Sequence, residues 1–212
     1  MLLRQILEHI TDNPEEAYRR LMERYGSMQK ALYAEYEDLV EVLPEEKTGT
    51  VYLRLLRELA RYVSVEPFGQ TPVLHTASRV RQYLEACYIG AKCEKCLLLC
   101  LDEKFRLIHC VDMSKGSAME VSVYMRRIAE EALRSESSYV VMSHNHPSGK
   151  QLFSLEDLQA THAAAEAMRS IGVRLLDHVL VTRWGSVSLR KEGVFQTIWD
   201  GTGEAWEKNY LS

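Results

Sequence analysis

The sequence predicts an α/β domain built on a mixed β-sheet, preceded by a small all-helical bundle. Apolar residues recur at helical spacing through the first 63 residues, whereas short apolar runs alternate with amphipathic segments from about residue 76 onward. The stretch between them, SVEPFGQTPV, contains two prolines and a glycine and interrupts the helical period. We therefore expect a helical bundle over residues 1–63, a linker over 64–75, an α/β domain over 76–194 and a C-terminal tail over 195–212.

Local signals mark the helices of the bundle. Asn13 offers an N-cap, Pro14 occupies the first helical position, and Gly26 suits the C-terminal end of the same helix. A further helix is expected from about Gly49, with its apolar residues on one face. That face consists of Val51, Leu55, Leu59 and Tyr62 or Val63.

Helices and strands interleave in the predicted α/β domain. Apolar periodicity predicts helices over about residues 78–87, 122–133 and 154–170. Shorter apolar runs, bounded by turn residues, predict strands over 96–101, 105–111, 139–143, 173–182 and 186–189. Helices that alternate with strands in this way indicate a mixed sheet covered by helices.

The composition is that of an ordinary globular protein. Of the 212 residues, 46% are apolar and 26% are charged. No apolar run approaches the roughly 20 residues of a membrane-spanning helix. The start of the chain, MLLRQILEHITDNPEE, lacks the apolar run and cleavage site of a signal peptide. We expect no membrane association and a cytoplasmic location.

Cysteine usage and net charge narrow the class of protein further. The five cysteines are odd in number and crowd into 24 positions, a poor layout for a disulfide framework, so we expect reduced thiols. Cys93 and Cys96 have the spacing of half a structural zinc site, but no second pair follows at a suitable distance. The net charge of −4 provides no overall positive field for nucleic acid, although it leaves room for a local basic patch.

The segment SHNHPSG (residues 143–149), followed by Ser154 and Asp157, carries the clearest chemistry. His144 and His146, two apart at the end of a strand, project to the same side because strand side chains alternate. Asp157 lies in the first turn of a helix whose N-cap would be Ser154. Two imidazoles and one carboxylate form a three-ligand zinc site with a fourth position open to water, which is the catalytic rather than the structural arrangement.

Each of these residues also has a purely structural interpretation. A lone histidine is usually a surface or hydrogen-bonded core residue, and an isolated HxH pair carries little information. The carboxylate at a loop-to-helix junction and the Pro-Ser-Gly turn before it favour metal binding. His178, which follows Asp177 at the start of an apolar strand, is interpreted as a hydrogen-bonded core histidine.

The pattern His144-x-His146-x7-Ser154-x2-Asp157 resembles the full JAMM, or MPN-plus, metalloprotease signature. The wider string HNHPSG, with Leu176-Asp177-His178 and the apolar VLV that follows, is similar to the RadC family within that fold, over roughly residues 76–194. The resemblance implies a JAMM/MPN-type mixed sheet flanked by helices, in a cytidine-deaminase-like arrangement. It also implies one zinc ion per chain, held by His144, His146 and Asp157, with Ser154 supporting the bound water or the oxyanion.

Members of the family also carry a glutamate at the start of the first core strand. Glu94, just ahead of the run CLLLCLD, falls at that position, and the resemblance implies that it is the general base. Such a carboxylate could take a proton from the zinc-bound water and deliver it to a leaving amine. Taken alone, Glu94 would be interpreted as a solvated charge beside Lys92 and Lys95.

Two features depart from the family pattern. Cys96 stands where RadC-like proteins usually carry an aromatic residue, and the approach to HNHPSG is RSESSY rather than an asparagine-rich segment. Neither includes a predicted ligand, so these departures bear on substrate preference rather than on metal binding.

The N-terminal bundle resembles the helix-hairpin-helix region that precedes the catalytic domain in RadC-like proteins, over Tyr25-Gly26-Ser27 through Leu43 and the final helix. Such hairpins normally hold a DNA phosphate with the backbone amides of a Gly-x-Gly turn. This chain has LPEEKTG instead, with Glu45 and Glu46 where the phosphate would bind. We therefore expect a degenerate hairpin that is structural or binds protein, rather than DNA.

Together these patterns favour a zinc-dependent peptidase or isopeptidase that uses a metal-activated water on a peptide or protein substrate, with Glu94 as base and then acid. One alternative is a nucleic-acid-associated accessory protein of the DNA-repair type, with a structural zinc site or nuclease activity. A nuclease would more often show several carboxylates for magnesium than two histidines and one aspartate. A protein-binding scaffold is a further alternative, which retention of the whole signature with Glu94 disfavours.

The hairpin sequence predicts that the intact protein binds duplex DNA weakly and with a shallow salt dependence, because Glu45 and Glu46 repel phosphate. Fluorescence anisotropy titrations at several salt concentrations measure both quantities. Nanomolar binding at physiological salt that is lost on substitution of Lys47 would overturn the degenerate-hairpin interpretation.

Overall fold

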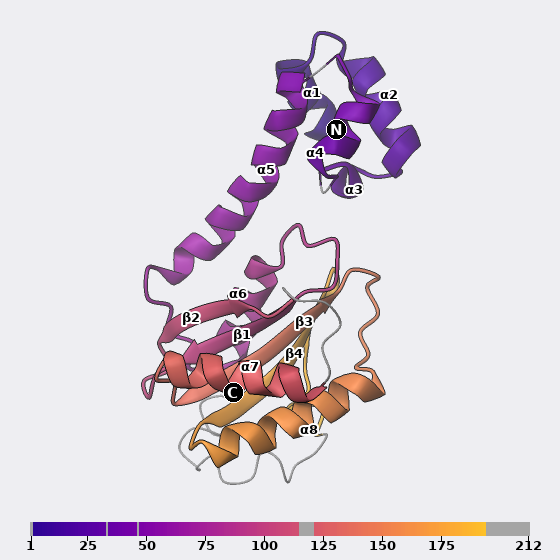
Figure 1. Cartoon of the computed structure of the whole chain (residues 1–212). Helices are drawn as coiled ribbons and strands as arrows, with labels where there is room; N and C mark the ends of the chain where they lie inside the picture. Colours follow the sequence, from indigo (N-terminus) through magenta and orange to yellow (C-terminus); the bar gives the residue numbers. More distant parts are fainter. Residues whose placement is uncertain (1, 33, 46, 115–120, 194–212) are drawn as a thin grey trace. The chain divides into compact units, whose positions relative to one another are not determined.

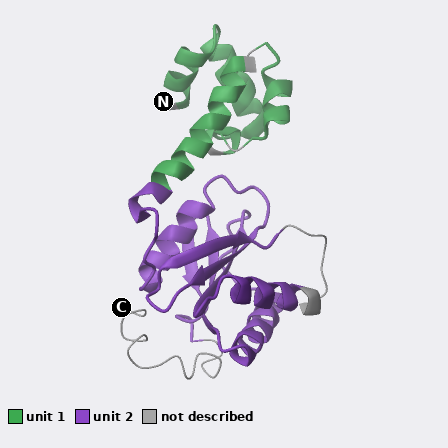
Figure 2. Cartoon of the chain, turned by 60° about the vertical axis from the view of Figure 1, so that its left-hand side comes forward, with its two compact units in different colours: residues 1–64 green, residues 65–212 purple. Residues whose placement is uncertain are grey.

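A computed structural model describes residues 2–32, 34–45, 47–114 and 121–193 (Figure 1). The predicted tail over 195–212 and the hairpin residue Glu46 lie outside these ranges. The chain divides into two compact units, Met1–Ser64 and Val65–Ser212 (Figure 2). The first unit is helical and the second contains a mixed five-stranded sheet flanked by helices, so the predicted fold class is confirmed.

The described part of the first unit contains the helices α1 (Leu2–Ile10), α2 (Pro14–Tyr25), α3 (Met28–Leu32), α4 (Tyr36–Val42) and most of α5 (Lys47–Val65). α2 begins as the sequence predicts, because the Asn13 side chain accepts a hydrogen bond from the Glu16 amide. It ends at Gly26, whose φ of 72° lies in the left-handed region. Buried leucines from these helices form the core of the unit: Leu3, Leu7, Leu21, Leu39 and Leu53.

The apolar face predicted for the last helix is not the face that packs into this core. Val51, Leu55 and Leu59 are exposed, whereas Leu53 is fully buried. Helical periodicity places apolar residues on a common face, but it does not show which apolar face of a helix meets its neighbours. α5 therefore carries one buried and one exposed apolar face.

The sheet of the second unit has the strand order β2-β1-β3-β4-β5. Its strands are β1 (Cys96–Leu101), β2 (Leu107–Asp112), β3 (Tyr139–His146), β4 (Arg174–Thr182) and β5 (Gly185–Ser188). A short 3-10 helix, η1 (Glu66–Phe68), and the helices α6 (Ala77–Cys87), α7 (Val121–Arg134) and α8 (Leu155–Ser170) accompany them. β3 and β4 are parallel and are joined through α8, while the other neighbouring pairs are antiparallel. Within the described ranges, no helix has both the length and the apolar character that crossing a bilayer requires.

Helices cover both faces of this sheet. α7 and α8 cover one face (Figure 1), and they pack on it through side chains such as Ile128 and Met168. α6 packs on the other face through Val80 and Leu84. Because both faces are covered, β1 can be the nearly continuous apolar run CLLLCL rather than an alternating one.

β3 is longer than the sequence predicts. The expected end was Ser143, but the strand continues to His146. The polar residues stay in the strand because β1 and β4 pair with them on either side, with His144 opposite Cys96 and His146 opposite Thr182. Both histidines therefore sit on regular strand backbone, and the predicted projection to one side holds.

Candidate metal centre

The three side chains predicted to bind metal converge at the carboxyl end of β3. His144 and His146 come from that strand, and Asp157 comes from the first turn of α8. His144 Nε2 lies 3.2 Å from His146 Nε2 and 3.4 Å from Asp157 Oδ1, and the three ligand atoms all lie within 4.8 Å of one another. Ligands held about 2.0–2.1 Å from a tetrahedral zinc ion are themselves roughly 3.3 Å apart. The spacing of the donors therefore fits a single small cation.

The turn between β3 and α8 depends on Gly149. Its φ of +86° lies in the left-handed region, which residues with a Cβ rarely adopt. A Cβ at this position would also lie 2.9 Å from both Arg183 Nε and Trp184 Nε1, in the connection between β4 and β5. The Pro-Ser-Gly turn thus packs closely against that connection and returns the chain to the start of α8.

Ser154 orients the Asp157 carboxylate through a capping box at the start of α8. The Ser154 hydroxyl accepts a hydrogen bond from the Asp157 amide at 3.1 Å. The same hydroxyl donates a hydrogen bond to Asp157 Oδ2 at 2.8 Å, and the Ser154 amide donates one to that oxygen at 2.7 Å. The two hydrogen bonds that Ser154 donates are both made to Oδ2. The other carboxylate oxygen, Oδ1, therefore faces His144. Burial alone would raise the pKa of Asp157, but the neighbouring His144 ring and the hydrogen bonds from Ser154 outweigh burial and lower that pKa. The role of Ser154 on the water or the oxyanion stays a prediction.

One backbone carbonyl determines that Nδ1 of His146 carries a proton. Its Nδ1 lies 2.8 Å from the carbonyl oxygen of Lys150. A carbonyl oxygen can only accept a hydrogen bond, so Nδ1 carries the proton. In the neutral form of the ring, the unprotonated nitrogen is then Nε2, which faces His144. Histidines that bind metals usually donate their other ring N–H in this way.

A buried chain of hydrogen bonds determines which ring nitrogen of His144 carries the proton. Thr161 Oγ1 donates to the Asp157 carbonyl at 2.6 Å, so it accepts from His178 Nδ1, also at 2.6 Å. His178 Nε2 then carries no proton and accepts from His144 Nδ1 at 2.9 Å. Burial is the main cause that lowers the pKa of His178 to about 3, and the repulsion that a protonated His144 would exert acts in the same direction, so the His178 ring stays neutral. His144 Nε2 therefore presents a lone pair to His146 and Asp157.

His146 Nε2 and Asp157 Oδ1 consequently lie 3.2 and 3.4 Å from His144 Nε2, so three electron-rich atoms face one another. Acceptors this close repel one another unless a cation lies among them. His178 is buried and hydrogen-bonded, as its sequence context predicts, but it also orients a candidate ligand. Sequence spacing alone signals no such role, because His178 and His144 lie 34 residues apart.

Asn145, between the two histidines, holds the loop that carries Glu94. The Asn145 side chain accepts the Lys95 amide at 2.7 Å and donates to the Cys93 carbonyl at 3.2 Å, while its own amide donates to the Lys95 carbonyl at 3.2 Å. These bonds secure the residues on both sides of Glu94. The local sequence gives no signal of this contact, because Asn145 lies 50 and 52 residues from its side-chain partners.

Glu94 and the three candidate ligands line one hollow of about 380 Å³. Glu94 itself is exposed and lies just ahead of β1. Tyr124 from α7 and Leu152 from the loop before α8 also line the hollow, and neither residue was anticipated from the sequence. Burial raises the pKa of Tyr124 well above its usual value, so its hydroxyl remains a hydrogen-bond donor.

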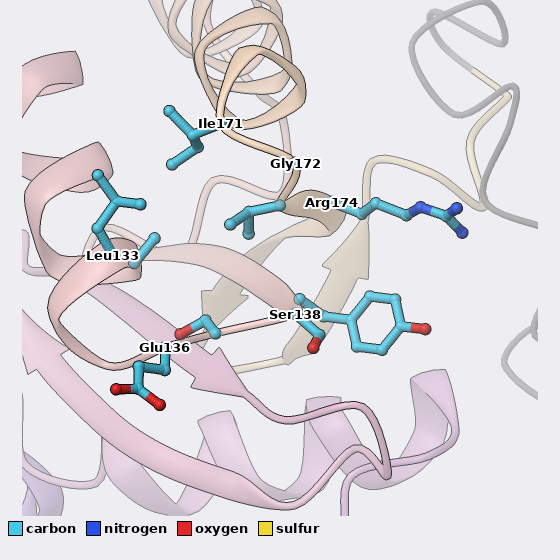
Figure 3. A pocket seen from close by; sticks show the side chains of 10 residues that line it. Leu133, Glu136, Ser138, Ile171, Gly172 and Arg174 are labelled. Atoms are coloured by element: carbon cyan, nitrogen blue, oxygen red, sulfur yellow. The ribbon is translucent and has the colours of Figure 1, made fainter.

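A second hollow, of about 480 Å³, lies at the opposite end of β3, near the ends of α7 and α8 (Figure 3). Leu133 and Ile171 lie on one side of it, and the Arg174 side chain extends away from them (Figure 3). The grouped metal-ligand side chains found among the described residues are His144, His146 and Asp157, so this end of the sheet contributes none.

The five cysteines, all within the described ranges, are reduced thiols there and form no disulfide, as the sequence predicts. Cys93 is exposed, and Cys96 packs against the core between the sheet and helices α7 and α8. Neither belongs to a grouping of potential metal ligands in the described ranges.

Comparison with known proteins shows a family and several proteins to which this chain is similar. Residues 74–194 match the family model described as "RadC-like JAB domain", and that region contains every candidate site residue. A UPF0758 protein of Bordetella pertussis is 32% identical over 174 residues, which cover 82% of this chain and 77% of that protein. UPF0758 proteins of Herminiimonas arsenicoxydans and Paracidovorax citrulli are 32% and 31% identical, over 82% and 85% of this chain and 78% and 76% of their own lengths.

The neutral state of His178 predicts a loss of stability on acidification of the metal-free protein. The pKa of an unfolded histidine is about 6.5, whereas that of His178 is lowered to about 3. Protons therefore bind the unfolded state first, so the contribution is complete above about pH 6.5 and is lost as the pH falls toward 3. Between pH 6.5 and 4.5, the free energy of unfolding should fall by up to about 2–3 kcal/mol more in the wild type than in His178→Gln.

Urea unfolding followed by tryptophan fluorescence measures this difference, because all three tryptophans lie in the second unit. His75→Gln, at an exposed position in the same unit, should retain the wild-type dependence on pH. If the free energy of unfolding fell equally with pH in the wild type and in His178→Gln, the neutral, buried state of His178 would be contradicted.

Proposed function

The chain belongs to the RadC-like JAB domain family, and on that premise we propose that it is a zinc-dependent hydrolase that cuts an amide bond of a peptide or isopeptide. The observation that carries the proposal is the convergence of His144 Nε2, His146 Nε2 and Asp157 Oδ1 on one point in the wall of a hollow. Three protein ligands leave one tetrahedral position open, as in catalytic rather than structural zinc sites.

The donor set favours zinc over magnesium. Magnesium prefers six oxygen ligands in octahedral geometry, whereas zinc readily takes two imidazole nitrogens and one carboxylate oxygen. The hydrogen bonds behind the ligands support the same choice, since His146 donates to the Lys150 carbonyl and His144 to His178. A nuclease that depends on magnesium would need oxygen donors that this cluster does not offer.

Zinc in this position would lower the pKa of a coordinated water to about 7 and polarise the substrate carbonyl. The protein's own side chains would then handle the proton. Glu94, which lines the same hollow, can accept a proton from the attacking water and pass it to the leaving amine. Asn145 acts as a positioning residue for Glu94, because it secures the backbone of Cys93 and Lys95 on either side.

The surroundings of the hollow suit a polypeptide better than a nucleic acid. Leu152, which lines it, is 65% exposed, and Leu155 at the start of α8 is exposed to the same extent. Glu94 also lines the hollow, and its carboxylate, which binds no metal in this proposal, would repel a phosphodiester backbone. Exposed leucines beside the site can instead pack against side chains of an extended peptide.

Removal of a proposed ligand should abolish zinc retention. His144→Ala or Asp157→Ala leaves two protein ligands, too few to hold the ion against a mild chelator. Elemental analysis of protein purified without added metal should give about one zinc per wild-type chain and close to none in either variant. The control His75→Ala, at an exposed histidine of the same unit, should keep the wild-type content. Wild-type stoichiometry in either ligand variant would overturn the ligand assignment.

Loss of the proposed base should separate catalysis from metal binding. Glu94→Gln keeps the shape of the side chain but cannot accept a proton, so zinc content and thermal stability should stay close to wild type. Hydrolysis should fall by about 10² to 10⁴, the usual contribution of general acid–base catalysis.

The activity is first sought by screening the purified protein against peptide and isopeptide libraries at neutral pH, with and without chelator. Glu103→Gln, at an exposed glutamate in the β1–β2 turn, is the matched control and should be fully active. A chelator-sensitive activity that is indifferent to Glu94→Gln would remove Glu94 from the mechanism while leaving the metal assignment intact.

A further inference from the structure

α5 exposes six large apolar side chains: Val51, Tyr52, Leu55, Leu59, Tyr62 and Val63. Their exposed fractions range from 43% at Val51 to 67% at Tyr62. Figure 1 shows α5 running past the other helices of the first unit, which leaves part of its length without a helical neighbour in that unit. Tyr52, Leu55, Leu59 and Tyr62 also follow the alternating three- and four-residue spacing of a coiled-coil seam. A continuous exposed apolar stripe of this kind marks a contact surface.

The order of residue types along this stripe is palindromic: it reads the same from either end of the helix. Three pairs of identical residues lie at equal distances on either side of Arg57: Leu55 and Leu59, Tyr52 and Tyr62, and Val51 and Val63. Arg57 is also one residue from the middle of the 19-residue helix. An isologous interface brings one patch against itself across a two-fold axis, which requires a self-complementary surface. A palindromic helix face meets this requirement when two copies pack antiparallel.

We propose that this face of α5 pairs with α5 of a second copy of the chain, antiparallel, about a two-fold axis level with Arg57. The pairing sets Leu55 of each copy against Leu59 of the other, and places the tyrosine and valine pairs outside them. A heterologous partner imposes no such symmetry on the sequence, which is why a second copy is favoured. The proposal does not depend on hydrolase activity.

The size of the face is compatible with this pairing. The exposed parts of the six side chains amount to roughly 600 Å² per copy, so two copies would bury on the order of 1,200 Å², the lower end of specific interfaces. Beside the stripe, Glu58 forms an ion pair with Arg61 at 3.4 Å. In the antiparallel pair, the two Glu58 carboxylates lie near the axis and are bordered by Arg54 and Arg61 of both copies. The two carboxylates are like charges, and each keeps its ion pair with Arg61 of its own copy, so this flank adds little attraction and the apolar stripe carries the pairing.

Sedimentation velocity of the full chain over a concentration series tests the proposal. The wild type should dimerise at micromolar concentrations. Leu55→Lys or Leu59→Glu, each at the centre of the pairing, should raise the dimer dissociation constant by roughly 30-fold or more, as substitutions of central interface residues do. Leu133→Glu is the matched control, because Leu133 and Leu59 are both 56% exposed on helices. Circular dichroism checks that each variant remains folded.

The double variant Leu55→Lys with Leu59→Glu distinguishes the orientation. In an antiparallel pair the introduced charges face their opposites twice, so dimerisation should recover relative to either single variant. In a parallel pair, like charges would meet. A monomeric wild type, single variants that dimerise normally, or a double variant no better than the singles would each overturn the proposal. A monomer whose α5 tyrosines resist surface labelling would instead show that the stripe is covered within one chain.

Discussion

Two backbone carbonyl oxygens determine the chemistry of the candidate metal centre. The carbonyl of Lys150 orients His146 directly, and that of Asp157 orients His144 through two buried side chains. Because a carbonyl oxygen only accepts hydrogen bonds, each chain of bonds has a single direction and ends in an imidazole lone pair. Both lone pairs are directed to the same point, where the Asp157 carboxylate completes the set.

The first turn of α8 has two functions in this arrangement. The backbone of Asp157 begins the buried hydrogen-bond chain, and its side chain supplies the third candidate ligand. The capping box with Ser154 couples these functions, because the bonds that begin the helix also orient the carboxylate. A shift of this helix end would therefore change the direction of two ligands together.

The sequence predicted the residues that converge, and Ser154, which orients Asp157, but not the residues that orient the two histidines. His144, His146 and Asp157 follow local rules, namely strand alternation, a turn and a helix cap, which spacing along the chain reveals. The contact of His178 with His144 depends on how β4 pairs with β3. A bulge in β4 between Leu175 and Asp177 shifts the register, so that His178 points toward α8. Periodicity alone would have placed Leu175 and His178 on opposite faces.

The other helices and strands were likewise predictable where they depend on local sequence patterns, and not where they depend on contacts with distant segments. The helices and strands of the second unit were predicted within a few residues because their apolar patterns are local, whereas β3 was predicted too short because its end depends on pairing with two neighbours. For α5, periodicity identified an apolar face but not that the core would take a different one, with Leu53 buried and Leu55 exposed. Asn145 went unassigned for the same reason, since its partners come from the loop ahead of β1.

The position of one proton on each imidazole ring tests this arrangement most directly. Nitrogen-15 NMR of the zinc-loaded protein, read through long-range couplings to the ring protons, distinguishes Nδ1–H from Nε2–H in each histidine. We expect His144, His146 and His178 all to carry the proton on Nδ1, with the Nε2 signals of His144 and His146 shifted by the metal. A proton on Nε2 of His144 or His146 in the loaded protein would contradict the central claim that these two lone pairs form the metal site.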